Sequence, residues 1–121
     1  MADLFLSKTL VLANTTKTVL YTAPANTISI VKSLRIHNAH TSAVLATVNF
    51  IDVDSDTAAN TESTLFKMNI SAVSAHTDTF PLGNPIELIT HPLVANEGDI
   101  INVTAGTAAK IHVHLSVLEI T

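Results

Sequence analysis

A two-residue alternation of apolar and polar side chains recurs along this chain and constrains its fold more than any other feature. In the segment 27–38, the apolar side chains at even positions fall on one face: Ile28, Ile30, Leu34 and Ile36. Polar side chains take most of the odd positions, with Val31 as the exception. Because successive side chains of a β-strand point to opposite faces, this pattern predicts half-buried strands.

Turn-forming residues separate the alternating runs, among them Pro24, Pro92, Gly106 and the segment 81–85, PLGNP. The sequence predicts about eight strands, near 3–12, 16–22, 27–37, 43–53, 63–70, 73–80, 86–90, 99–104 and 109–120. Short strands with regular turn signals and no helices between them are typical of an antiparallel sandwich or barrel.

We therefore predict an all-β fold: a single antiparallel β-sandwich, jelly-roll-like, or a flattened barrel. With 121 residues, the chain fits one domain. Residues 14–121 form the predicted β-sandwich domain, and residues 1–13 form an N-terminal strand or arm. The predicted core consists of Ile30, Leu34, Ile36, Val48, Phe50, Ile101, Val103, Val113 and Leu115.

The surface is unusually poor in charge, because only 13% of the residues are charged and about 25% is typical. A neutral polar surface protects poorly against association, so it suits a protein that packs against copies of itself or a partner. The net charge is −4 and no basic run occurs, which argues against nucleic acid as a partner. No stretch approaches the roughly 18 apolar residues of a membrane span. We expect no membrane association.

The N-terminal run is apolar on both faces if it is extended. Leu4, Leu6 and Leu10 fall on one face, and Phe5 falls on the other. Such a run is either a fully covered strand or an arm that docks on a neighbouring subunit. We predict a homo-oligomer and place these four residues in a possible interface with another subunit or a partner protein.

His112 and His114 lie one residue apart in a strand-like run, so both imidazoles point to the same face. They could reach one metal ion, but a stable site usually needs a third ligand, and the chain has no Cys to supply it. His37, His40, His76, His91 or a carboxylate remain open as that ligand, as does a symmetry axis. We favour ordinary strand positions within an interface and predict no metal.

Other candidate sites lack essential parts. Asp52, Asp54 and Asp56 are spaced like the start of a calcium loop, but Thr57 and Ser63 occupy the positions that require Gly and Glu. No nucleophile elbow or phosphate-cradling glycine loop occurs. We therefore predict no catalytic residue, no enzymatic activity and no cofactor.

Three stretches together resemble small virion structural proteins of tailed bacteriophages. They are TVLYTAPANTISIVKSLRIHN (18–38), IELITHPLVANEGDIINVTA (86–105) and VHLSVLEIT (113–121). The likeness covers nearly all of the chain after residue 14, whereas residues 1–13 match no such pattern.

The resemblance implies a β-sandwich subunit, often a homotrimer, that decorates or cements a capsid by binding the major capsid protein. It also implies a place on the capsid surface of the virion, after synthesis in the host cytoplasm. A tail, fibre or head–tail module that binds a receptor or glycan is the alternative. Glycan sites usually use exposed aromatic side chains, and this chain has only Tyr21 and four Phe.

Overall fold

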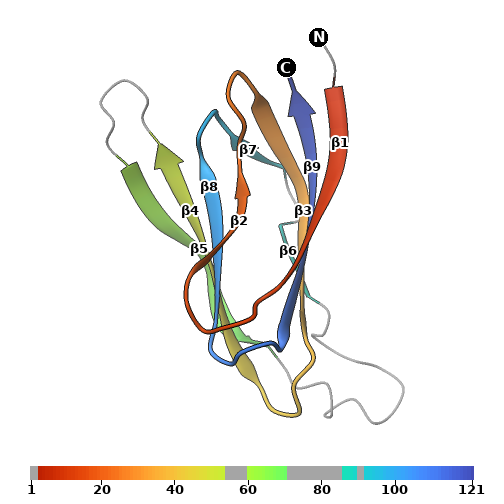
Figure 1. Cartoon of the computed structure of the whole chain (residues 1–121), viewed down its shortest axis with the longest axis vertical. Coiled ribbons are helices and arrows are strands. Elements are labelled where there is room, and N and C mark those ends of the chain that lie inside the picture. The colour runs from red at the N-terminus through yellow and green to blue at the C-terminus, as the bar shows by residue number, and fades with distance from the viewer. Residues whose placement is uncertain (1–2, 54–59, 71–85, 90–91) are drawn as a thin grey trace.

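The computed structural model describes residues 3–53, 60–70, 86–89 and 92–121. These residues form nine strands and no helix, in two antiparallel sheets that face each other as a sandwich (Figure 1). The described part of the chain thus contains no helical segment that could span a membrane. The predicted strand at 73–80 lies outside the described residues.

The first sheet has five strands: β1 (Asp3–Val11), β9 (Ile111–Ile120), β3 (Ile28–Asn38), β6 (Ile86–Ile89) and β7 (Leu93–Ala95). The second sheet has four: β2 (Thr18–Thr22), β8 (Ile100–Ala105), β4 (Val44–Val53) and β5 (Asn60–Ile70).

The strand pairs are nested within one another along the chain. β4 pairs with β5, β3 with β6 and β7, β2 with β8, and β1 with β9. Such nesting arises when one long hairpin is rolled into two sheets, which gives the jelly-roll arrangement. The predicted antiparallel β-sandwich is therefore confirmed, with the jelly-roll order.

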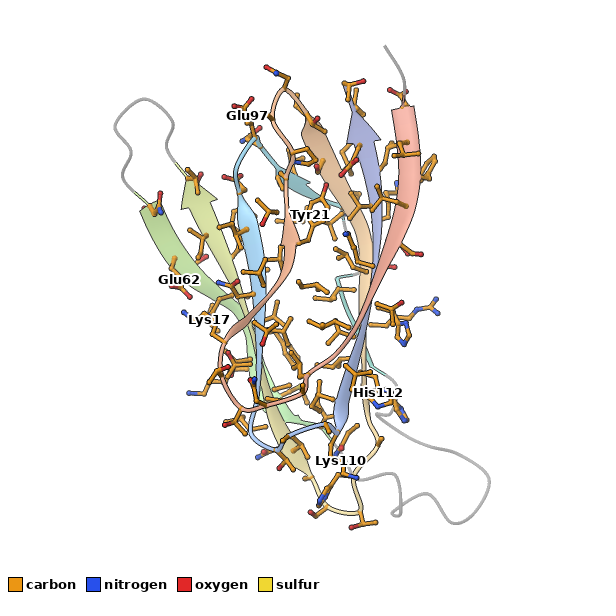
Figure 2. The ribbon with its side chains drawn as sticks, viewed as in Figure 1. Lys17, Tyr21, Glu62, Glu97, Lys110 and His112 are labelled. Carbon is orange, nitrogen blue, oxygen red and sulfur yellow. The ribbon has the colours of Figure 1, made fainter. Side chains whose placement is uncertain are left out.

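The core lies between the two sheets, where apolar side chains from both inner faces meet (Figure 2). The predicted core residues that are fully buried there are Leu34, Ile36, Val48, Ile101, Val103, Val113 and Leu115. Phe50 packs against this cluster from a partly buried position. Removing such side chains from water is the main stabilising contribution to a sandwich of this size.

The predicted inward face of β3 is wrong in its first half. The β3–β9 register shifts between Val31 and Ser33, which marks a bulge at Lys32. Before the bulge, Val31 is buried and Ile28 is 49% exposed; after it, the even positions face the core. Ile30 consequently lies half-buried on the outer face, and not in the predicted core.

The N-terminal run forms strand β1, which pairs with β9 along its whole length at the edge of the five-stranded sheet. Leu6 and Leu10 are partly buried and pack against the core of their own chain. Leu4 and Phe5 are 55% and 71% exposed. β1 therefore presents apolar side chains both to the interior and to the surroundings.

Candidate functional site

The outer face of the five-stranded sheet carries an exposed apolar band. Cross-strand register aligns Phe5 with Leu118, Leu118 with Ile30, and Ile30 with Val94. The neighbouring pair Ile28 and Ile120 extends this row toward the end of the sheet. We call these six residues the apolar band. Phe5 and Val94, at its two ends, are 71% and 53% exposed.

A row of serines follows the apolar band along the strands. Ser7 on β1, Ser116 on β9 and Ser33 on β3 are aligned by register. Their hydroxyl groups are small and uncharged, so the row is a neutral border between the apolar band and the next group of side chains.

Beyond the serines, the same face carries four basic or protonatable side chains, which we call the His–Arg cluster: Arg35, His37, His112 and His114. Arg35 is aligned with His114, and His37 with His112. The rings of His37 and His112 meet edge to face with centroids 5.8 Å apart. Figure 2 shows His112 on the side of its sheet away from the sandwich interior.

A groove of about 400 Å³ opens at this cluster, lined by Arg35, Ile36, His37 and His114. The Oγ1 of Thr9, on the neighbouring strand β1, lies 3.4 Å from Nδ1 of His114. The cluster thus combines one permanent cation with imidazole nitrogens and a hydroxyl at the rim of a surface depression.

His112 and His114 share the outer face of β9, as the alternation predicted, and cross-strand pairing brings His37 beside them. Among the described residues, however, no three His, Asp or Glu side chains are placed to hold a metal ion together. His76 and His91 lie outside the described residues. The absence of a metal site therefore stays a prediction, which a chelator can test.

A second polar cluster lies inside the sandwich, at the edge where β1 and β2 face each other. Tyr21, only 4% exposed, donates its hydroxyl proton to Glu119, and its oxygen lies 2.7 Å from Oγ of Ser29. Ser29 and Glu119 are register partners on β3 and β9. The Tyr21 side chain therefore links the four-stranded sheet to the five-stranded one (Figure 2).

Burial, reinforced by the hydrogen bond to Glu119, raises the pKa of Tyr21 to about 12. The phenol consequently stays protonated at neutral pH and acts as a hydrogen-bond donor, not as a base or a nucleophile. A surface depression of about 510 Å³ lies beside it, with Leu6, Lys8, Pro24 and Glu119 among its lining residues. The role of this cluster is therefore structural, because it joins the two sheets.

A third polar cluster covers the outer face of the four-stranded sheet. Nζ of Lys17 lies 2.5 Å from Oε2 of Glu62, and Nδ2 of Asn49 donates to the same oxygen at 2.8 Å. The hydrogen bond from Lys17 holds the pKa of Glu62 below its usual value. Oδ1 of Asn49 and Oδ1 of its register partner Asn102 are buried without a hydrogen-bond partner. Lys17, Glu62 and Asn49 thus bind one another, whereas the two amide oxygens do not.

The Tyr21–Glu119 link was not found by sequence reasoning, because the two residues are 98 positions apart. The sequence did carry one signal: Glu119 is a charged residue at a position that the alternation of β9 places on the inward face. Of the calcium-like aspartates, Asp52 is exposed on β4, and Asp54 and Asp56 lie outside the described residues.

Comparison with known proteins found no matching family model and no matching curated protein. Among solved structures, the chain is similar to one from the acidic stable capsid structure of Helicobacter pylori bacteriophage KHP30. That match has 13% identity and a TM-score of 0.56, and covers 98% of this chain and 87% of the other.

Two further matches have lower scores. A pentameric capsid protein from metagenomic phage sequences has 17% identity and a TM-score of 0.39, covering 95% of this chain and 58% of that one. Xylanase 10B of Clostridium thermocellum has 8% identity and a TM-score of 0.49, covering 97% and 25%. The KHP30 likeness shows a shared fold, and the two lower scores carry no further conclusion.

Proposed function

We propose that this protein is a non-enzymatic virion structural protein of a tailed bacteriophage, a decoration or cement protein that binds and stabilises the assembled capsid. The observation that carries the proposal is the apolar band, in which Phe5, Ile28 and Val94 are exposed and no side chain is charged. Contiguous exposed apolar patches of this kind mark interaction surfaces. The fold shared with a bacteriophage capsid chain and the sequence resemblance both support this assignment.

The apolar band gives the proposed contact a definite place. Phe5 belongs to the band, and His112 and His114 share its sheet face, so these three remain interface candidates. Leu4 is exposed on the same strand, whereas Leu6 and Leu10 are committed to the core of their own chain. The partner is the major capsid protein.

The protein acts as a homo-oligomer, for which a trimer is the best match to the sequence resemblance. An oligomer that engages several capsid subunits at once gains avidity over a single contact, provided that its geometry permits simultaneous binding. Isolated capsid subunits offer single contacts only. Binding should therefore require the assembled lattice, and it should stabilise that lattice by mass action.

The test adds purified protein to capsids that lack it, then measures co-sedimentation and the temperature of DNA release. We expect binding to capsids but not to free capsid subunits, and a higher release temperature. Because the apolar band is neutral, moderate salt should weaken binding little. Failure to co-sediment would contradict the proposal, and binding to host cells or glycans would favour the fibre or tail alternative.

A pair of variants locates the contact. Phe5→Ser removes the aromatic side chain of the apolar band, and an aromatic anchor of an interface is typically worth about 2 kcal/mol, or roughly 30-fold in affinity. Val19→Ser is the matched control, because Val19 is 54% exposed on a strand of the other sheet. Equal weakening by both substitutions would show that the apolar band is not the contact.

A further inference from the structure

The His–Arg cluster is not explained by a neutral apolar contact. The chain carries a net charge of −4, with six Lys and Arg residues in all. Yet Arg35 and three of the six histidines lie together on one face of β3 and β9. In an acidic chain, such a concentration of hydrogen-bond donors favours a negatively charged ligand.

The strand geometry arranges these donors as a two-by-two block. Register partners on antiparallel strands have Cβ atoms about 5 Å apart, and alternate residues on one strand are about 7 Å apart. Arg35 and His114 form one pair, and His37 and His112 form the other. Side chains on such a block can converge on one small anion. The groove of about 400 Å³ at Arg35, His37 and His114 provides the space.

The chemistry of each side chain suits an oxyanion. The planar guanidinium of Arg35 presents a fork of N–H donors that matches carboxylate and phosphate oxygens. Histidine is the side chain that most readily gains a proton between about pH 5 and pH 8, and both ring nitrogens are donors in the protonated form. The Thr9 hydroxyl, 3.4 Å from His114, adds a further polar contact at the rim.

The neighbouring strand β1 brings no charged side chain opposite the two histidines of β9. On β1, the register partners of His114 and His112 are Thr9 and Val11, which are both uncharged. Lys110 precedes β9, and β6 places Glu87 opposite Arg35 in the backbone register.

We propose that this groove is a binding site for an oxyanion, either a carboxylate or a tetrahedral phosphate-like group, in which Arg35 supplies the permanent charge. The imidazoles of His37, His112 and His114 add ring N–H donors around it. This site does not depend on the proposed capsid contact, because its ligand is a small anion and not the capsid protein.

The test is a titration of ¹⁵N-labelled protein with sodium sulfate at a fixed, near-neutral pH, followed by amide chemical shifts. Sodium chloride holds the ionic strength constant. We expect saturable shifts centred on residues 35, 37, 112 and 114. A parallel titration with sodium acetate distinguishes a preference for a carboxylate from one for a tetrahedral anion.

Three variants complete the test. Arg35→Gln should abolish saturable binding, and His114→Gln, which removes a second side chain of the groove lining, should weaken it. Lys67→Gln is the control, because Lys67 is exposed on β5 of the other sheet and its loss should change nothing. Arg35 and His114 are also exposed, so all three variants should fold, which a thermal melt verifies.

Two results would overturn the proposal: shifts that chloride reproduces, or binding that survives Arg35→Gln. None of these readouts involves capsids. The site can therefore fail while the proposed decoration function stands, and the reverse is also possible.

Discussion

Two polar clusters of this protein use similar chemistry in opposite ways. Tyr21 lies between the sheets, donates to Glu119 and lies in hydrogen-bond contact with Ser29. Arg35 and His114 lie on the outer face of one sheet, beside a groove. The first cluster is buried and finds its partners within the chain, whereas the second presents its donors outward.

This contrast separates groups that hold the fold from groups that remain available to a ligand. A buried polar group costs several kcal/mol if it is unpaired, so Tyr21 must find partners within the chain. An exposed group has water as a partner, and its substitution usually changes stability by about 0.5 kcal/mol or less. Substitutions in the buried cluster should therefore change the free energy of unfolding, whereas substitutions in the exposed cluster should change ligand binding.

The largest expected effect comes from Tyr21→Phe, which keeps the ring but removes the hydroxyl group. A hydrogen bond to a charged group contributes about 1.5–3 kcal/mol, and Glu119 would lose its donor. We expect the free energy of unfolding to fall by about that amount in urea denaturation. His114→Gln is the control and should change it by less than about 0.5 kcal/mol. If Tyr21→Phe and His114→Gln lowered the free energy of unfolding equally, the distinction between a cluster that holds the fold and one that is available to a ligand would be wrong.

The two clusters also differ in how far they could be predicted from the sequence. His112 and His114 were recognised because alternation alone places neighbouring odd or even positions on one face. Tyr21 and Glu119 meet only when β2 folds over β9, and no local pattern encodes that long-range contact. The sequence thus predicted which side chains share a face within one strand, but not a link between two sheets.

The fold shows the same limit within a single strand. Alternation predicted β3 as a strand, but placed Ile30 inside, because a period of two assumes an unbroken register. The bulge at Lys32 inserts one residue and exchanges the faces of everything before it. The Ile28–Ile30 end of β3 could therefore join the apolar band on the outer face, which the sequence did not predict.

The second expected effect is a loss of stability in alkali. The pKa of Tyr21 is raised to about 12, above the value of about 10 for an unfolded tyrosine. Between these values the folded state holds a proton that the unfolded state has released, so stability falls as pH rises. We expect the stability difference between wild type and Tyr21→Phe to shrink by about 1–2 kcal/mol from pH 10 to pH 12. A constant difference would show that the hydroxyl ionises freely.

A smaller effect is expected at the Lys17–Glu62 ion pair, which is exposed but satisfied within the chain. Because Lys17 holds the pKa of Glu62 below its usual value, the pair stabilises the folded state above the unfolded pKa, about 4.3. That contribution is lost as pH falls through the folded pKa. We expect Glu62→Gln to differ from wild type at pH 6 but not in strong acid, as measured by thermal unfolding. High salt should also reduce the difference.

The smallest expected effect concerns His112 and His114, whose spacing first suggested a metal site. If they are ordinary strand positions, a chelator should leave the melting temperature of the purified protein unchanged. The double variant His112→Gln, His114→Gln should respond to chelator in the same way. A structural metal would give the opposite result, because binding energy at such a site is folding energy, and its removal destabilises the protein. A large drop in melting temperature that zinc or nickel restores, and that the double variant lacks, would reassign the His–Arg cluster from an anion site to a metal site.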